Sequence, residues 1–512
     1  MYSVSKSNQT TFVYGPEVYE KLIMKDHLLF QINEKVDFSF INKMCEDLYC
    51  SNKGRPVTNT PEMMLRSAVV QYLYDYSDRQ MEYESQVNIM VKWFIGLKLE
   101  DNAYDHSALG YFRDKLGRDK WNEVFYSILN QIRDAGFSKG DTQYIDATHV
   151  IANIAIPGTI GILRQGITEV LKTLKKVDHQ LYKELGGKKQ TMRREKAYDM
   201  GQKEKESRLI EIVNEAKIVI HKTQNSDGIV KEKVETLKRI IGENIQGEGE
   251  GNEDNISRKK GQVKDRIVNP VDIDARHGAK SDKKKFVGYK VNSTMSEDRF
   301  ITNINATRGN SYDGDSLLPL IDKGVDNGQV INKVVADGAY GSASNRVGML
   351  KRNAVLIAPV SKETNTAGDY YPQSMFKIDS SGVTCPAGNR TMISYYDKKN
   401  GKLLYHFKKS DCGDCSCKSK CTKLDHRTIT VNKHYSVLQE AKRYSISHEF
   451  KDEMKMRARI EPKQGEMKRF HGLKRAKFWG IDKLNIQALL TGIAVNLKRF
   501  VKLSTHRYRV LS

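Results

Sequence analysis

Apolar residues recur at helical spacing between residues 60 and 136. Thr60 and Pro61 suit the cap and first turn of a helix in PEMMLRSAVVQYLYDYS, and Asp105 suits the cap of the next apolar run, HSALGYFRDKLG. A third run with the same spacing, KWNEVFYSILNQIRDAG, follows. We therefore expect an all-helical N-terminal domain over residues 1–138.

A second helical region is predicted between residues 161 and 255. Its apolar residues are three, four or seven positions apart in a background rich in Lys and Glu. They include Ile167, Leu171, Leu174, Leu181 and Leu185. This spacing predicts a helical hairpin inserted into a larger domain, followed by a flexible acidic linker in QGEGEGNEDN, residues 246–255.

Residues 139–160 and 256–360 have the pattern of strands and short helices. The first predicted strand is TQYIDATHV, and FVGYKVNSTMS and RFITNINATRGN form the next two. A helix, the strand INKVVADGAYGS, a second helix and the strand AVLIAPV follow. This order predicts an α/β fold in which a mixed sheet is flanked by helices.

The rest of the chain divides at residue 440. Residues 361–440 contain a predicted hairpin around Lys399, Asn400 and Gly401, and five of the seven cysteines. Residues 441–512 are predicted to be helical, with an apolar stripe that we expect to be buried. The stripe consists of Leu484, Ala488, Leu489, Ile493, Leu497 and Phe500.

Charge narrows the choice of partner. The formal net charge is +22 and the pI is about 9.4, which favours a polyanion and makes nucleic acid the first candidate. Residues 451–512 are especially basic, with sixteen Lys or Arg against five Asp or Glu. Because no apolar run reaches membrane-spanning length and the N-terminus lacks the apolar core of a signal peptide, we expect a soluble intracellular protein.

Two aspartates lie in or at the end of predicted strands. Asp146 interrupts YIDATHV, where an aspartate has low strand propensity, and Asp337 ends a strand in VVADGAYG. Either one alone would be interpreted as a turn or cap residue. Together with a glutamate from a helix, they supply three hard oxygen ligands of the kind that bind Mg²⁺ or Mn²⁺.

The candidate glutamate lies in RARIEPKQGEMKR, residues 457–469. Arg457 precedes Glu461 by four residues and Lys468 follows it by seven, so all three share one face of a continuous helix. Pro462 leaves two alternatives, a helix that begins at Pro462 with Glu461 at its cap, or a kink at that point. Glu466 is interpreted as a surface charge.

These motifs resemble those of the DDE transposases of bacterial insertion sequences, which have an RNase H-like catalytic domain. Asp146, Thr148 and Ala152 resemble the first motif, D-x-T-x-x-x-A, and ADGAYGSASN resembles the second. RARIEPKQGEMK resembles the last part of the signature Y-x2-R-x3-E-x6-K. The signature tyrosine falls at Met454, so its hydroxyl is either missing or supplied from elsewhere, for example by Tyr444.

The resemblance implies catalytic and metal-binding roles for Asp146, Asp337 and Glu461, which would hold two Mg²⁺ or Mn²⁺ ions. It implies cleavage at the ends of the element and joining of those ends to target DNA. Arg457 and Lys468 would contact phosphate near the cut. We expect further DNA contacts from cations of the same basic segment, namely Arg459, Lys474 and Arg475.

The resemblance also concerns assembly and location. It implies DNA as partner, both the terminal inverted repeats and the target, with a homodimer in the DNA complex, in the bacterial cytoplasm at the nucleoid. The N-terminal domain would bind the ends of the element, the alternative being dimerisation or packing. Two other functions fit the same residues: an inactive DNA-binding protein derived from a transposon, and a metal-dependent nuclease without strand transfer.

The cysteines between residues 385 and 421 form a second candidate metal site. A C-x2-C pair is formed by Cys412 and Cys415, and Cys421 follows it in the sequence. With Cys385 as a distant fourth ligand, this arrangement is typical of a zinc ribbon. Cys417 is able to replace any of the last three. An iron–sulfur cluster and a set of free thiols are the alternatives.

Overall fold

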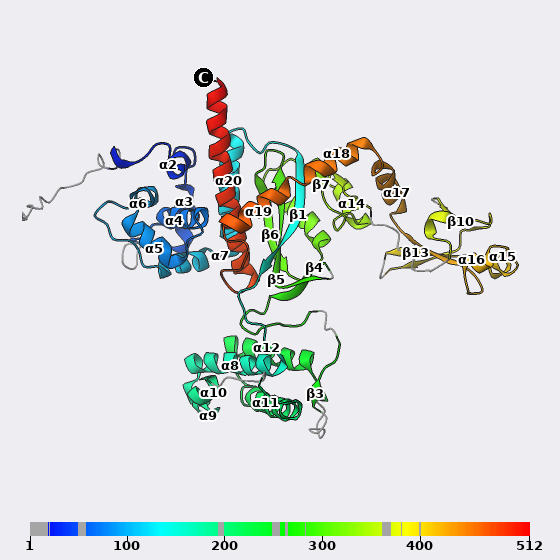
Figure 1. Ribbon diagram of the computed structural model, residues 1–512, viewed down its shortest axis with the longest axis horizontal. Helices are drawn as coiled ribbons and strands as arrows, with labels where there is room; N and C mark the ends of the chain where they lie inside the picture. Colours follow the sequence, from blue (N-terminus) through cyan, green and yellow to red (C-terminus); the bar gives the residue numbers. More distant parts are fainter. Residues whose placement is uncertain are drawn as a thin grey trace, which may run out of the picture.

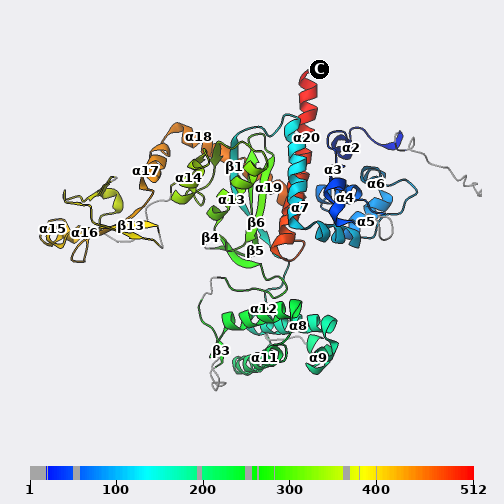
Figure 2. The ribbon, with the colours of Figure 1, turned by 180° about the vertical axis from the view of Figure 1, so that it is seen from behind.

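The computed structural model describes residues 19, 21–49, 58–192, 199–247, 256–261, 265–281, 283–360, 370–379, 381–398 and 401–511, with side chains through residue 505. A twisted sheet lies at the centre, with helices beside it, a helical body below and a small cysteine-rich body at one side (Figure 1). Figure 2 shows the same arrangement from behind. No helix within the described ranges is long and apolar enough to cross a membrane.

The central sheet is built around strand β1 (Thr142–Ile151). On one side β1 pairs antiparallel with β5 (Lys284–Ser296), and on the other it pairs parallel with β7 (Lys333–Val335), which pairs parallel with β8 (Val355–Ile357). The far edge of β5 pairs with β6 (Ile301–Arg308). This order and these directions confirm the predicted RNase H-like mixed sheet.

Strand β4 (Arg276–Ser281) lies between the first and second predicted strands in the chain, and it was not among the strands that the sequence pattern predicts. It pairs antiparallel with the first part of β5. The segment contains almost no apolar residues, so its strand pairing leaves no periodic signal. It begins at Arg276, which is fully buried and donates from Nε to Asp265 Oδ1 at 2.7 Å.

Helices cover both faces of the sheet. On one face, α13 (Leu317–Asp326), preceded by the short helix η3 (Asp313–Ser316), and α14 (Ala343–Leu350) pack with β7, β8 and Ile145 in one apolar cluster. On the other face, α20 (Ile481–Leu511) packs against β6 and α7 (Ser107–Asp134). The predicted stripe from Leu484 to Phe500 is buried on this face, as expected.

The N-terminal helices share this second core. They are α2 (Leu28–Asn33), α3 (Phe40–Met44), η1 (Glu46–Leu48), α4 (Pro61–Leu73), α5 (Asp78–Val87) and α6 (Ile89–Ile95). Their apolar residues, those of α7 and α20 and those of the sheet form one continuous cluster. The core therefore continues across residue 138, and the boundary at that residue remains a proposal.

Local signals fixed the ends of these helices as predicted. Thr60 Oγ1 accepts from the Met63 amide at 3.2 Å, with Pro61 as the first helical residue. Asp105 Oδ1 accepts from the Ser107 amide at 2.8 Å at the start of α7, although the capping position itself is His106. Gly117 breaks α7 with φ 66° and ψ 175°, between the two helical runs expected there.

The helical insertion has its own core, but the predicted hairpin is wrong. Three long helices, α8 (Thr159–Val177), α11 (Gln202–Lys222) and α12 (Gly228–Asn244), pack with α9 (His179–Glu184) and α10 (Gly187–Met192). The short strands β2 (Ile245–Gln246) and β3 (Ser257–Arg258) pair at the exit. Most of the predicted acidic linker, residues 248–255, lies outside the described residues.

The cysteine-rich body also has its own apolar core. Strands β9 (Lys377–Ile378), β10 (Val383–Thr384) and β11 (Arg390–Thr391) form one small sheet, and β12 (Ser394–Asp397), β13 (Lys402–His406) and β14 (Thr428–Asn432) form another. The pairing of β12 with β13 confirms the predicted hairpin, although Lys399 and Asn400 at its tip lie outside the described residues. The short helices η4 (Gln373–Met375), α15 (Lys409–Gly413) and α16 (Lys418–Cys421) complete this body.

Three helices return the chain to the sheet. They are α17 (Tyr435–Tyr444), α18 (His448–Arg457) and α19 (Ile460–Phe470). In Figure 1 they run from the cysteine-rich body back across the sheet towards α20. Helix α19 contacts both β1 and α20, so it links the central strand to the C-terminal helix.

Two asparagines of α20 satisfy the open edge of β6. Asn496 accepts from the Ile301 amide and donates to the Ile301 carbonyl, both at 2.8 Å, and Asn485 accepts from the Ala306 amide at 2.7 Å. Both asparagine side chains are buried. An exposed edge strand would otherwise present unpaired backbone groups, so these bonds both protect the edge and orient α20.

We expect Asn496→Ala to lower the free energy of unfolding by about 2–4 kcal/mol, because it leaves a buried amide and a buried carbonyl of Ile301 without partners. Thermal and urea unfolding followed by circular dichroism would measure the change. Asn102→Ala, at an exposed position of the loop between α6 and α7, is the matched control. Equal stability of the two variants would contradict this role of Asn496.

Candidate active site

The register of the sheet brings the two predicted aspartates together. Strands β1 and β7 are adjacent and parallel, with Tyr144 paired to Val335. Asp146 lies two residues beyond Tyr144, and Asp337 lies two residues beyond Val335 at the end of β7. The two aspartates therefore lie at the same level of neighbouring chains, and both line one cavity of about 490 Å³.

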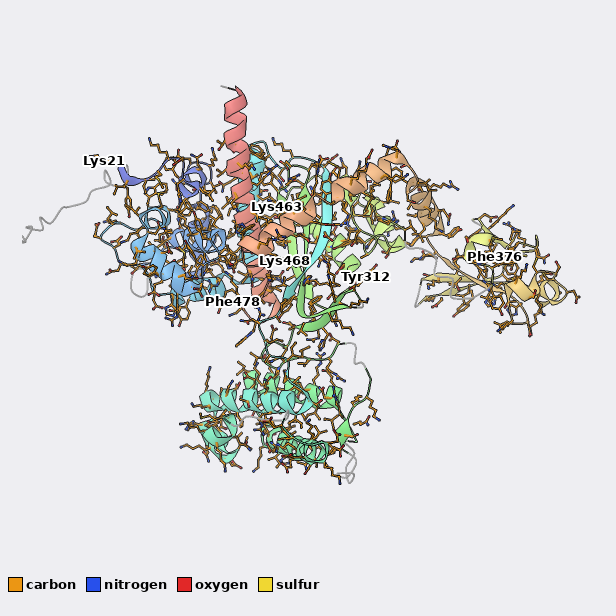
Figure 3. The ribbon with its side chains drawn as sticks, viewed as in Figure 1. Lys21, Tyr312, Phe376, Lys463, Lys468 and Phe478 are labelled. Atoms are coloured by element: carbon orange, nitrogen blue, oxygen red, sulfur yellow. The ribbon has the colours of Figure 1, made fainter. Side chains whose placement is uncertain are left out.

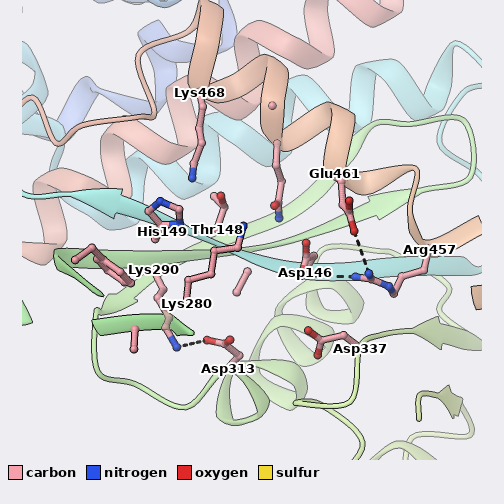
Figure 4. A pocket seen from close by; sticks show the side chains of 15 residues that line it. Asp146, Thr148, His149, Lys280, Lys290, Asp313, Asp337, Arg457, Glu461 and Lys468 are labelled. Carbon is pink, nitrogen blue, oxygen red and sulfur yellow. Dashed lines mark hydrogen bonds and ion pairs between the residues drawn. The ribbon is translucent and has the colours of Figure 1, made fainter. Parts of the chain in front are cut away.

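Glu461 enters the same cavity from α19 (Figure 4). The helix begins at Ile460, two residues before Pro462, so neither predicted alternative is correct. Pro462 lies in the first turn, where its missing N–H would have no helical partner in any case. The break is at Ala458 and Arg459, between α18 and α19, and it places Glu461 in the first turn of the second helix.

Arg457 lies between two of the three carboxylates. Its Nη2 is 3.0 Å from Glu461 Oε1, and its Nη1 is 3.8 Å from Asp146 Oδ1. Figure 4 shows both contacts, with Asp337 on the other side of Asp146. This guanidinium, from the last residue of α18, provides a positive charge at a point where acidic side chains converge.

Burial raises the pKa of Asp146 to about 6, although the charge of Arg457 acts in the opposite direction. The neighbouring carboxylates of Asp337 and Glu461 raise this pKa further. Burial and the two neighbouring carboxylates disfavour a negative charge at Asp146 unless a cation is nearby. The site therefore favours binding of positive charge.

The donor set suits a divalent cation. Three carboxylates offer hard oxygen ligands of the type that Mg²⁺ and Mn²⁺ prefer. Asp337 is oriented by the Ala339 amide, which donates to its Oδ1 at 2.9 Å. Arg457 stands in for part of the charge that such a cation would bring.

A tighter acidic group lies elsewhere. Within the described ranges, ligand atoms of three acidic, histidine or cysteine residues come within 4.8 Å of one another at Glu82, Asp105 and His106. Glu82 Oε2 accepts from the His106 amide at 3.2 Å and lies 3.1 Å from His106 Nδ1. These bonds fasten the start of α7 to α5, and they account for the group without a metal.

Basic side chains form the other wall of the cavity. Lys280, Lys290 and Lys468 line it together with Arg457. Lys290 pairs with Asp313 at 2.8 Å. Burial and the neighbouring charge of Lys280 lower the pKa of Lys468 to about 8.

The sequence predicted only some of the residues in this wall. Lys290 lies in the predicted strand FVGYKVNSTMS, whereas the unpredicted strand β4 brings Lys280 to the cavity. No sequence pattern pointed to Asp313, at the start of η3, as a residue of this site. His149 and Phe286 lie on adjacent strands with ring centroids 5.1 Å apart, and both line the cavity.

The remaining predicted DNA contacts lie outside this cavity. Arg459 lines a different cleft, on the other side of α19. Lys474 and Arg475 are exposed and follow α19, where the Ile151 amide donates to the Lys474 carbonyl at 3.2 Å. Arg475 donates to Asn153 Oδ1 at 3.3 Å, so both cations lie beside the end of β1.

The interpretation of Glu466 as a surface charge is wrong. Its carboxylate pairs with Lys463 at 2.8 Å and with Lys498 at 3.2 Å, and its side chain is 26% exposed. Hydrogen bonds from His471 and Lys463 hold the pKa of Glu466 well below its usual range, against the effect of burial. Glu466 is thus the internal counter-ion between α19 and α20.

The position of the signature tyrosine is occupied by an apolar contact. Met454 packs against the main core. Tyr444 donates its hydroxyl to Glu453 Oε2 at 2.9 Å, and Glu453 pairs with Lys333 at 2.7 Å. Tyr444 is not among the residues that line the cavity, so it does not replace the signature hydroxyl there.

The five clustered cysteines line a cavity of about 20 Å³, a size that suits a single small ion or water. Cys385, Cys412 and Cys415 are close enough to Cys421 to contribute to the raised pKa of its thiol, whose largest cause is burial. Cys417 lies beside Tyr371. Thiols are donors that zinc prefers, and Cys385, Cys412, Cys415 and Cys421 all line this cavity.

Two family models match the chain, one towards each end. The description "Transposase domain (DUF772)" applies to residues 17–115, and "Transposase DDE domain" applies to residues 384–501. Together, these two matches support a DDE transposase of the insertion-sequence type. The second match contains Arg457, Glu461, Lys468 and most of the cysteine-rich body, including its five cysteines, whereas Asp146 and Asp337 lie outside both matches.

Other comparisons add little. A solved synaptic complex of piggyBac transposase with hairpin DNA is similar at a TM-score of 0.30 and 9% identity, over 96% of this transposase and 75% of that chain. A similarity of this size does not by itself establish a shared fold. A search of curated proteins finds no match.

We expect the purified transposase to contain about one zinc ion per chain, held by Cys385, Cys412, Cys415 and Cys421. Cys421→Ser should remove the zinc, as measured by elemental analysis. Cys417→Ser is the matched control and should retain it. Iron with visible absorbance, or equal zinc in both variants, would contradict the assignment.

Proposed function

We propose that this transposase cleaves DNA at the ends of its own insertion sequence and joins those ends to target DNA. Asp146, Asp337 and Glu461 would hold two Mg²⁺ or Mn²⁺ ions and form the catalytic centre. The observation that carries the proposal is that these three carboxylates line one cavity, with the guanidinium of Arg457 between Asp146 and Glu461. The transposase family supports the use of a divalent metal.

Bound at these carboxylates, such ions supply a cationic centre that activates water or a 3′-OH and stabilises the leaving oxygen of a phosphodiester. The chain itself contributes position and charge. Asp146 and Asp337 are fixed by the paired strands β1 and β7, and Glu461 is fixed by the first turn of α19. A rigid arrangement of this kind holds the scissile phosphate in one orientation through successive steps.

The basic wall supports DNA as the substrate. Lys280 and Lys468 lie on opposite elements of the cavity, β4 and α19, so phosphates on either side of the reacting one meet a cation. Arg457 would pass from its contacts with Asp146 and Glu461 to a phosphate when a metal occupies the carboxylates. Lys474 and Arg475 would extend the contact along the strand beyond β1.

Two further elements belong to the same proposal. The N-terminal helices would bind the ends of the element, and a homodimer would hold two ends together in the DNA complex. The alternatives are a nuclease that does not join strands and an inactive DNA-binding derivative. The intact carboxylates favour an active enzyme over the inactive derivative.

One assay separates these functions. The transposase is incubated with Mg²⁺ and DNA that carries its own terminal repeats, and the products are resolved as cleaved and joined strands. Joined products support the transposition reaction, whereas cleavage without joining supports the nuclease. Absence of cleavage would remove the enzyme proposal.

Asp337→Asn should reduce cleavage by at least about a thousandfold while leaving DNA affinity nearly unchanged, because the three carboxylates act as one unit. Asp313→Asn is the matched control, since Asp313 lines the same cavity but pairs with Lys290. It should retain most of the cleavage activity. Cleavage by Asp337→Asn at the wild-type rate would refute the metal assignment.

The contribution of Lys468 to DNA affinity should fall as the pH rises through about 8, the lowered pKa of this lysine, because its ammonium loses a proton. At about 0.1 M salt, loss of this one phosphate contact should weaken binding about fivefold between pH 7 and 9. Lys468→Arg keeps its charge and should not show that decline. Fluorescence anisotropy of a labelled duplex measures the DNA affinity of both proteins as a function of pH. Parallel curves for the two proteins would contradict a phosphate contact from Lys468.

A further inference from the structure

A second basic cleft lies across α19 from the candidate active site. We name it the α19–α20 cleft. It has a volume of about 340 Å³ and is lined by Arg299, Arg459, Lys463, Lys498, Arg499 and Lys502. Glu466 is the one carboxylate among the residues that line it. The excess of positive charge is therefore concentrated on a second surface, separate from the catalytic cavity.

The two clefts use opposite faces of one helix. Glu461, Gly465 and Lys468 recur at four and three residues and face the catalytic cavity. Pro462, Lys463 and Glu466 are displaced from them by one to two residues, which is about 100° to 200° around a helix, and face the second cleft. Lys463 and Lys468 are both labelled on α19 in Figure 3.

Part of the charge in the α19–α20 cleft is neutralised internally. Glu466 pairs with Lys463, which is buried, and with Lys498. The Glu466–Lys498 pair joins α19 to α20, so it has a structural role. Four cations of the cleft, Arg299, Arg459, Arg499 and Lys502, form no ion pair within the described chain, although the charges of Asp298 and Glu466 act on Arg499.

Those four cations are held close together on rigid elements. Arg499 is fixed by a bond from Nε to the Asp298 carbonyl at 2.9 Å, and the charge of Arg299 adds to burial in lowering the pKa of Arg499. Arg459, on the turn before α19, and Lys502, on α20, are exposed. Like charges confined in this way are stabilised when an anion binds between them.

Arg299 lies at an unfavourable backbone position for an arginine. Its φ is 69°, in the turn between β5 and β6, where glycine would be the least strained residue. The arginine at this position points its charge into the cleft, beside Arg499. A surface turn under no other constraint would not need a cation at this position.

We infer that the α19–α20 cleft binds the phosphate backbone of a second segment of duplex DNA, on the other side of α19 from the reacting strand. The inference rests on the proposed function, since it takes DNA as the ligand. The arginines and lysines here come from four elements along an open groove, which suits a run of backbone phosphates better than one small anion. Contacts of this kind do not depend on base sequence.

The test is the salt dependence of binding to a duplex of random sequence. The variant Arg299→Gly/Arg459→Gln/Lys502→Gln removes three exposed cations that form no ion pair within the described chain, and glycine suits the backbone at residue 299. Loss of three phosphate contacts should lower the slope of log affinity against log salt by about 3. Raising the salt from about 50 to about 200 mM should then weaken wild-type binding about 40-fold more than variant binding.

Lys175→Gln/Lys176→Gln, on the exposed surface of α8 in the helical insertion, provides the control for loss of charge and should leave the slope unchanged. An equal slope for the triple variant and the wild type would overturn the inference, while cleavage of terminal-repeat DNA by the wild type would leave the proposed function intact. A wild-type protein that binds no DNA would overturn both. Unfolding curves are recorded for the triple variant and the wild type. If the curves match, a smaller slope of log affinity against log salt reports loss of DNA contacts and not loss of folding.

Discussion

The parallel pairing of β1 with β7 is the constraint on which the candidate active site depends. It is short, but it fixes Tyr144 beside Val335 and therefore Asp146 level with Asp337. A slip of one residue would turn one aspartate to the opposite face of the sheet. The long antiparallel pairing of β1 with β5 prevents such a slip, because it holds the central strand over most of its length.

Much of this arrangement could be predicted from the sequence. The strands that carry Asp146 and Asp337 have strong apolar signals, and the spacing of Arg457, Glu461 and Lys468 gave the helix face that meets them. Strand β4 could not be predicted, because backbone pairing to β5 holds a segment whose side chains are nearly all polar. The sequence could not predict which cleft Arg459 and Glu466 face, because this depends on α20. That helix packs against α19 only in the folded chain.

The two insertions show how the sheet tolerates additional chain. The helical insertion and the cysteine-rich body each bury their own apolar cluster. Neither insertion therefore depends on the sheet core for its packing, and the register of β1, β5 and β7 is unaffected by the size of the insertions. The chain leaves the sheet after β1 and after β8 and returns in both cases to an element that lines the candidate active site, β4 or α19.

The order of synthesis matters for the edge of β6. Ile301 and Ala306 leave the ribosome nearly two hundred residues before Asn496 and Asn485, the side chains that satisfy their backbone groups. During that interval the nascent chain presents an open strand edge, the kind of surface that pairs wrongly with other chains. Glu461 also emerges late, so synthesis completes the three carboxylates of the candidate active site and the closure of the sheet edge at almost the same time.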